Sequence, residues 1–198
     1  MNLALRACVR SFLAIAAIGA VTASAHDAHA LGPLDVEVGA RVGAATNPNS
    51  NTPTPFGVGV GGRAGLSIFH IYGGISAIHY FGSSNDVSGP ATPAGTFGVA
   101  TVDYSSTLIG GELGYSITSI PHLTLRPQLG IGNASFSFGD ASQSHLYLEP
   151  GFVALIHVGL LYVGADANVL AIPSVDQGNN ETKTYTSLTV HGQIGLRF

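Results

Sequence analysis

Histidine and serine side chains are the residues of this chain whose chemistry could support catalysis. The sequence contains eight histidines, and two of them, His79 and His145, fall near one predicted end of the fold, where Ser105 and Ser144 could approach them. A histidine that activates a serine hydroxyl, and is itself oriented by an acid, would cleave an ester bond. No spacing among these residues is diagnostic of such a site, so we predict no catalytic residue.

The other candidate sites fail on spacing or context. The histidines lack the short, regular spacings that hold a metal ion. The glycine-rich segment 57–65 is followed neither by a helix nor by the Gly-Lys-Ser/Thr of a phosphate-binding loop. The formal net charge of −4, without a basic stripe, does not suit a nucleic-acid partner. We therefore predict no metal, no cofactor and no nucleic acid.

Nine charged residues lie within segments where apolar residues occupy every second position. In the first segment, Asp35, Glu37 and Arg41 alternate with leucine, valine and alanine. All nine occupy the positions between the apolar residues, which they share with glycine and small polar residues: Asp35, Glu37, Arg41, Arg63, Glu112, Arg126, Glu149, Asp166 and Arg197. A period of two is typical of β-strands whose two faces meet different surroundings. The nine side chains are therefore predicted to share one face.

Eight such segments follow one another along residues 34–198, each about as long as the roughly ten residues that a strand needs to cross a membrane. Long polar connectors alternate with short ones. The long connectors are 45–55, 82–98, 137–144 and 171–183, and the short ones lie near Phe69-His70, Thr118–His122 and Ile156–Leu160. This order predicts an all-β fold, an eight-stranded antiparallel up-and-down transmembrane β-barrel over residues 34–198.

Two local features depart from an ideal barrel pattern. Pro127 and Pro150 fall inside predicted strands, and because proline has no N–H to donate, each predicts a bulge or a local edge.

The apolar segment 151–165 is the one stretch that a helix could also explain. It is short for a membrane-spanning helix, and it fits its neighbours as strand, turn and strand.

The glycine-rich charged face is predicted to line the lumen, with the apolar face outside. Only 9% of the residues are charged, against about 25% in a typical soluble domain. A soluble barrel of the lipocalin type is the alternative, and it would turn a richly charged face to water. Here that face is mostly glycine, which suits a crowded lumen. A charge facing lipid would cost about 2–4 kcal/mol at the bilayer midplane, which explains why the apolar phase has none.

Buried charges need partners, and the turn positions predict specific ones. The predicted ion pairs are Glu112 with Arg126, Glu37 with Arg63, and Asp35 with Arg197. Glu149 and Asp166 are expected nearly opposite each other, with a nearby arginine such as Arg126 bridging them. We interpret this luminal charge network as a structural plug; an ion path is the alternative.

The N-terminal segment has the pattern of a secretory signal peptide. Arg6 and Arg10 precede the apolar run 12–21, and Ala23-Ser24-Ala25 is a small-x-small cleavage signal. We predict a signal peptide over 1–25, a short stub over 26–33 and cleavage after Ala25, with Ala30 as the alternative. Cleavage removes Cys8, the only cysteine, so the exported chain would contain no disulfide.

The C-terminal segment resembles the terminal strand of outer-membrane proteins. It ends in an aromatic residue with apolar residues at alternate positions before it: Val190, Ile194, Leu196 and Phe198. Segments 125–132 and 161–166 are similar to strands of the small OmpA-type, OmpX-type and opacity-type eight-stranded barrels. The resemblance implies residence in the outer membrane of a Gram-negative bacterium, contact with its lipid, and recognition of the four terminal residues by the barrel-assembly machinery. Without tryptophan, the interfacial aromatic residues would be Phe56, Phe81, Tyr115, Phe152 and Phe198.

Such barrels serve several functions, so the fold does not select one. We predict a structural or surface-interaction role, in which the loops 45–55, 82–98, 137–144 and 171–183 could contact an extracellular ligand. A narrow, porin-like channel is one alternative. A lipid-modifying enzyme that uses His79 or His145 is another.

Overall fold

The computed structural model describes residues 34–46, 55–91, 97–138, 141–176 and 182–198. The predicted signal peptide (1–25) and stub (26–33) lie outside the described residues, and so do the central parts of the four long connectors. Within the described residues, no helix has the length and hydropathy needed to cross a membrane.

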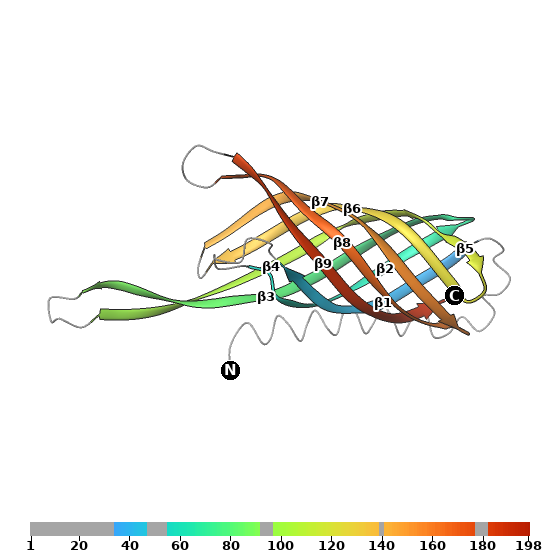
Figure 1. Ribbon diagram of the computed structural model, residues 1–198, viewed down its shortest axis with the longest axis horizontal. Coiled ribbons are helices and arrows are strands. Elements are labelled where there is room, and N and C mark those ends of the chain that lie inside the picture. Colours follow the sequence, from blue (N-terminus) through green and yellow to red (C-terminus); the bar gives the residue numbers. More distant parts are fainter. Residues whose placement is uncertain (1–33, 47–54, 92–96, 139–140, 177–181) are drawn as a thin grey trace.

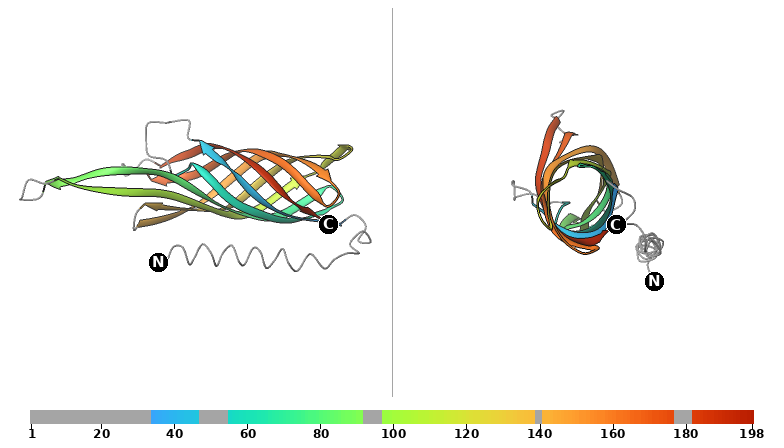
Figure 2. Two further views of the ribbon diagram at one scale, coloured as in Figure 1. Left: turned by 90° about the horizontal axis from the view of Figure 1, so that it is seen from below. Right: turned by 90° about the vertical axis from the view of Figure 1, so that its right-hand side faces the viewer.

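The described chain forms one closed antiparallel sheet. Its strands are β1 (Leu34–Thr46), β2 (Val58–Ile68), β3 (Ile71–Ala91), β4 (Phe97–Tyr115), β5 (Ile117–Ile120), β6 (Leu123–Phe138), β7 (Ala141–Val158), β8 (Leu161–Asp176) and β9 (Thr182–Arg197). Since β5 continues β4 beyond Ser116, nine strand segments occupy eight positions around the barrel. The pairings β1–β9 and β4–β6 close the ring, which Figure 2 shows end on. The predicted eight-stranded up-and-down barrel is confirmed.

The two ends of the barrel differ. Three tight turns lie at the end where the chain terminates (Figure 1), and in these turns Phe69, His122 and Gly159 have positive φ angles of 57°, 64° and 62°. At this end Phe198 and Val36 exchange two backbone hydrogen bonds of 2.9 Å, which joins β9 to β1. We call it the turn end, and the opposite end the loop end.

At the loop end the strands run further than the sequence predicted. β3 continues to Ala91 and β4 starts at Phe97, so most of the connector 82–98 is a hairpin that projects beyond the barrel in Figure 1. The ladder between β6 and β7 reaches the pair Phe138–Ala141, and β8 extends to Asp176. The predicted loop boundaries were therefore wrong. Polar residues indicate that a segment is exposed to water, but they do not show that it is a loop. The backbones of two exposed segments can still pair as strands, because this pairing satisfies their hydrogen bonds whether or not the side chains are buried.

Pro127 and Pro150 each interrupt strand pairing without producing a β-bulge. Pro127 lies between the pairs Gly114–Gln128 and Ile117–Leu125, where β4 gives way to β5, and these two pairs have the same register. Beside Pro150, pairing between β7 and β8 lapses from Leu148 to Gly151 and resumes in register. The expected local edge is present at each proline, and the expected bulge is not.

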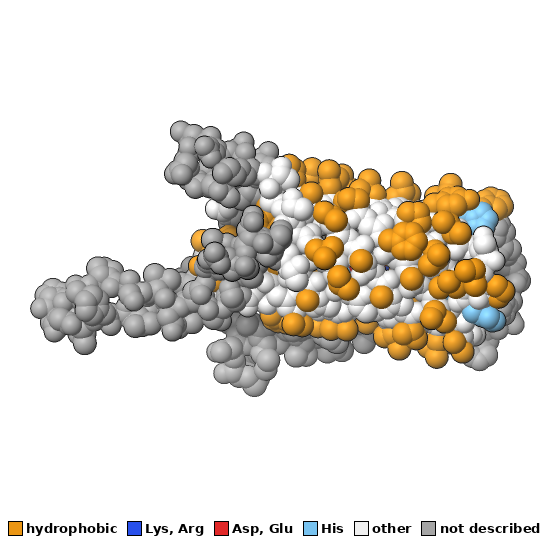
Figure 3. Space-filling model, viewed as in Figure 1, with side chains coloured by type: hydrophobic (Ala, Val, Ile, Leu, Met, Phe, Trp, Pro, Cys, Tyr) orange, Lys and Arg blue, Asp and Glu red, His pale blue; other side chains and the backbone are white. Residues whose placement is uncertain are grey.

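Side chains alternate between an apolar exterior and a filled interior. On the outside, Ile75 is 69% exposed and Leu113 is 61% exposed, whereas Arg126 on the inside is 1% exposed. Figure 3 shows hydrophobic side chains spread along the described barrel surface on one face, between white backbone and other side chains, with histidine only near the turn end. This inside-out arrangement confirms a transmembrane β-barrel and contradicts the soluble lipocalin-like alternative.

Candidate functional site in the barrel lumen

The structure places all nine predicted charged residues on the inward face of the barrel wall. Seven of them are at most 8% exposed: Glu37, Arg41, Arg63, Glu112, Arg126, Glu149 and Asp166. The other two, Asp35 and Arg197, lie at the turn end, where their side chains are 33% and 26% exposed. Strand alternation alone accounts for the shared face, because residues two apart point to the same side.

Arg41 of β1 is central to the network. Its guanidinium donates to Glu112 of β4 at 2.9 Å and to Asp166 of β8 at 3.0 Å. The second carboxylate oxygen of Glu112 lies 2.9 Å from Arg63 of β2. Ionic contacts therefore connect four strands across the lumen, and each pairs a charge that burial would otherwise make costly.

Asp166 collects further donors on its two oxygens. Asn168 donates to it at 2.6 Å and Gln193 at 3.2 Å, while Nδ1 of His191 lies 2.6 Å away. The other ring nitrogen of His191 lies 2.6 Å from the hydroxyl of Tyr80. Asp166 is thus held by neutral donors as well as by Arg41, which fixes its position in the middle of the barrel.

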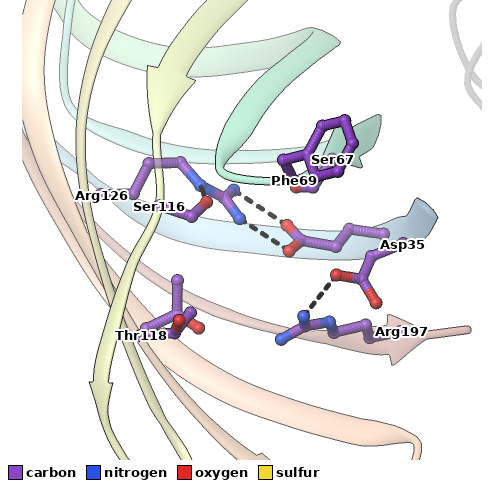
Figure 4. A pocket seen from close by; sticks show the side chains of 9 residues that line it. Asp35, Ser67, Phe69, Ser116, Thr118, Arg126 and Arg197 are labelled. Carbon is purple, nitrogen blue, oxygen red and sulfur yellow. Dashed lines mark hydrogen bonds and ion pairs between the residues drawn. The ribbon is translucent and has the colours of Figure 1, made fainter. Parts of the chain in front are cut away.

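A second ionic cluster lies nearer the turn end (Figure 4). Arg126 donates two hydrogen bonds to Glu37, at 2.7 and 2.9 Å, and its Nε donates to Ser116 at 3.0 Å. The guanidinium carbon lies 3.9 Å from the centre of the Tyr72 ring, a cation–π contact. Beside it Arg197 pairs with Asp35 at 2.5 Å, and both pairs line a pocket open at the turn end.

The register explains which predicted pairs form. Arg197 with Asp35 is present, but Glu112 with Arg126 and Glu37 with Arg63 were wrong. Ile120 pairs with Leu123, so the turn comes later than expected and Glu112 lies opposite Gly130. On the β1–β2 hairpin, Glu37 pairs with Gly65 and Arg63 with Gly39. Long side chains then find partners across the lumen, which hairpin register cannot predict.

The predicted bridge by Arg126 between two acids was also wrong. Asp166 contacts Arg41, and Glu149 accepts a hydrogen bond from Thr189 at 2.8 Å. Val153 is the residue opposite Asp166 on β7, because the register is offset from the expected one. Within the described residues, no arginine lies within 4.0 Å of Glu149.

Tyrosines on the glycine phase are functional candidates that the sequence analysis missed. Tyr72 and Tyr162 are buried in the lumen and extend over glycines of neighbouring strands. A Cβ atom on Gly65 would fall 2.5 Å from the Tyr72 ring, and one on Gly195 would fall 2.5 Å from the Tyr162 ring. Glycine here makes room for an aromatic side chain from the adjacent strand. Tyrosine in phase with glycine was the signal that could have revealed them.

This packing makes a testable prediction for Gly65. Gly65→Ala should destabilise the barrel by about 1–3 kcal/mol, because the new methyl group overpacks a site where Tyr72 is already pressed against Arg126. Gly73→Ala is the matched control, since Gly73 faces outward with nothing within 4 Å of its added Cβ. Denaturant unfolding in detergent, followed by circular dichroism, measures both. Equal stabilities for the two variants would contradict the packing argument.

An apolar cluster fills the lumen toward the loop end, a feature that the expected polar lumen did not include. Its largest members are the aromatic residues Tyr80, Tyr147, Phe56 and Phe136. Phe56 is 1% exposed, and its ring lies 5.5 Å from that of Tyr80. Its predicted place at the lipid interface was therefore wrong. Phe56 precedes β2, so the alternation inside that strand does not govern where it points.

The remaining predicted interfacial aromatics point outward or lie at the turn end. Phe81, Tyr115 and Phe152 are 55%, 53% and 44% exposed on the outer face. Val190, Ile194 and Leu196 also face outward on β9, and Phe198 ends the chain beside β1. Recognition of Val190, Ile194, Leu196 and Phe198 by the barrel-assembly machinery remains a prediction.

The two histidines considered for catalysis lie on different faces of the wall. His79 points outward from β3, and its Nδ1 lies 2.9 Å from the Thr107 hydroxyl. The His145 ring packs 6.0 Å from the inward-facing Phe136 ring. Among the described side chains, no group of three or more His, Cys, Asp or Glu residues is arranged to hold a metal ion.

Solved structures of small outer-membrane proteins have a similar fold. The structure of Neisserial surface protein A matches with a TM-score of 0.55 at 14% identity, over 84% of this chain and 97% of that one. A major outer membrane protein from Thermus thermophilus gives 0.53 at 13% identity, over 83% and 99%. No protein-family model and no curated protein matches the sequence. At such low identity the likeness establishes the fold alone.

Proposed function

We propose that this chain, which has the fold of the small outer-membrane β-barrels, is a closed barrel of a Gram-negative outer membrane with a structural or surface-interaction role. The matching proteins support this placement, since both are named as surface or outer-membrane proteins. The apolar exterior supplies the lipid contact. The turn end then faces the periplasm, and the loop end faces outward, as in bacterial barrels with short periplasmic turns.

The observation that carries the proposal is the filled lumen. Near the turn end Arg126 and Tyr72 are 1% and 0% exposed, Asp166 in the middle is 2% exposed, and Tyr80 toward the loop end is 0% exposed. Charged, aromatic and aliphatic side chains thus succeed one another from the turn end to the apolar cluster. An eight-stranded barrel has an interior just wide enough for side chains to fill. Such a lumen acts as a plug and offers solutes no continuous aqueous path.

The surface role belongs to the loop end. The β3–β4 hairpin projects beyond the barrel there (Figure 1), and the predicted segments 45–55, 137–144 and 171–183 join strands whose described ends lie at the same end. These segments would contact an extracellular ligand. During export, the barrel-assembly machinery would recognise Val190, Ile194, Leu196 and Phe198.

Planar-bilayer recordings of the full processed chain test the closed lumen. We expect no discrete current steps in concentrated KCl, with an open porin as the positive control for the bilayer. A shift in gel mobility between unboiled and boiled samples would show that the inserted protein is folded. Reproducible unitary steps from folded protein would contradict the proposal and favour the narrow channel.

A further inference from the structure

The buried charges of the lumen do not balance. Among the described side chains, the charged residues that are at most 8% exposed are three arginines and four acids: Arg41, Arg63, Arg126, Glu37, Glu112, Glu149 and Asp166. At the turn end, Arg197 and Asp35 pair with each other and add no net charge. If all four acids were ionised, the described lumen would carry one uncompensated negative charge. Because a buried charge without a partner is costly, binding one proton would stabilise the folded barrel.

Three of the four buried acids are held as carboxylates by cations. Each has an arginine nitrogen within 3.0 Å of a carboxylate oxygen: Glu37 with Arg126, Glu112 with Arg41 and Arg63, and Asp166 with Arg41. Hydrogen bonds from a cation favour the ionised form of a carboxyl group. These three acids are therefore poor places for the extra proton.

Glu149 of β7 is the exception. Within the described contacts its hydrogen bond comes from a neutral group, the Thr189 hydroxyl at 2.8 Å, and no arginine lies within 4.0 Å. Gly130 lies opposite it on β6 and brings no side chain. The titratable side chains that act on Glu149 through charge come from β1, β3, β7, β8 and β9: Arg41, Tyr80, Tyr147, Asp166 and His191. Arg41 is the fixed cation of this group, and its two terminal nitrogens already donate to Glu112 and Asp166.

His191 is the other group that could take the proton, but its hydrogen bonds favour the neutral ring. Its Nδ1 lies 2.6 Å from Asp166, and its Nε2 lies 2.6 Å from the Tyr80 hydroxyl. A neutral ring donates from Nδ1 to the carboxylate and accepts the tyrosine hydrogen at Nε2, so both contacts are satisfied. A protonated ring would donate from both nitrogens and leave the Tyr80 hydrogen without an acceptor among the described contacts. Glu149 is therefore the better place for the proton.

We propose that the lumen is a proton-binding site, in which Glu149 is a neutral carboxylic acid at neutral pH and so balances the charge of the plug. The inference rests on the proposed closed lumen, because an aqueous path would solvate a carboxylate there. A neutral acid with an unpaired hydroxyl costs far less than an unpaired buried charge. Removing the proton would leave the plug negatively charged, so this site makes the closed barrel sensitive to alkaline pH.

The stability of the barrel should fall as the pH rises. In the unfolded chain a glutamate ionises near about pH 4.3, whereas the folded barrel keeps the proton on Glu149 at neutral pH. Unfolding then releases one proton, and the unfolding equilibrium constant rises about tenfold for each pH unit. The dependence ends where the pH is high enough to deprotonate the folded barrel as well.

Denaturant unfolding of the full processed chain in detergent tests the proposal by comparison with Glu149→Gln. Glutamine has the shape of the neutral acid and keeps an oxygen that can accept from Thr189. Near neutral pH, the unfolding constant of the wild type should rise by about tenfold per pH unit relative to that of the variant. Histidine titration is common to both proteins and cancels in this ratio. Asp35→Asn makes the same chemical change at a partly exposed acid, and there the ratio should not change with pH.

Infrared spectroscopy of the folded protein detects the proton directly and does not depend on unfolding. At neutral pH the wild type should show the carbonyl stretch of a protonated carboxylic acid, and Glu149→Gln should lack it. Absence of this band from the wild type, its persistence in Glu149→Gln, or a pH-independent ratio for that variant would overturn the inference. Folded protein with neither current steps nor the band would retain the proposed function and lose only the proton site. Current steps would instead contradict the closed lumen itself.

Discussion

Replacing Arg126 with methionine is expected to destabilise the folded barrel by about 3–5 kcal/mol, because the change leaves a buried carboxylate without its partner. Glu37 accepts both of its charged hydrogen bonds from Arg126, and both side chains are 1% exposed. Methionine preserves much of the apolar volume against Tyr72, so the loss reports the missing charge. Denaturant unfolding in a defined detergent, followed by circular dichroism, measures the change.

A double-mutant cycle with Glu37→Gln isolates the pair. The double variant should recover part of the stability lost by Arg126→Met, because it removes the unpaired charge that the single variant leaves behind. Arg197→Met is the matched control, since its partner Asp35 is also a carboxylate but the two side chains are 26% and 33% exposed. Exposed pairs contribute about 0–1 kcal/mol. Equal losses for Arg126→Met and Arg197→Met would refute the buried network as a stabilising element.

Introducing arginine at Ile75 should cost about 2–4 kcal/mol, because the charge would face acyl chains near the bilayer midplane. Ile75 is 69% exposed and lies on β3 midway between the turn at His70 and Phe81. The matched substitution Thr186→Arg places the same side chain outward near the loop-side edge of β9, where the cost falls to about 0–1 kcal/mol.

Refolding into lipid bilayers, with unfolding by denaturant, measures both variants against the wild type. In detergent the difference between them should shrink, because a micelle adapts to a charge more readily than a bilayer does. Similar costs at the two positions in bilayers would mean that the apolar exterior does not mark a membrane-spanning surface.

The sequence could predict which face of the barrel wall each strand residue occupies. In residues 34–44 and 188–198, apolar residues alternate with glycine, polar and charged residues, and a strand that separates lipid from a packed lumen imposes that pattern. Alternation predicts which face a side chain joins, so it placed Glu37, Arg126 and Asp166 inside the barrel. The pairing of Asp35 with Arg197 was also predictable, because β1 and β9 must meet to close the barrel.

Contacts across the lumen could not be predicted in the same way. Arg126 of β6 reaches Glu37 of β1, and Arg41 of β1 reaches Glu112 of β4, so the partners lie on strands that are not neighbours. These contacts depend on the stagger of the whole barrel and on the reach of each side chain. Phe56 was misplaced for a related reason, since it lies just before β2, where alternation no longer applies.

The central claim is that the apolar face meets lipid while the charged face is sealed inside. Spin labels on single cysteines test it most directly, because cleavage of the predicted signal peptide would leave no native cysteine. Labels at Ile75, Leu113, Leu129 and Val163, all outward and exposed, should be accessible to oxygen and protected from a water-soluble nickel complex in bilayers. High accessibility to nickel at these four positions would contradict the account.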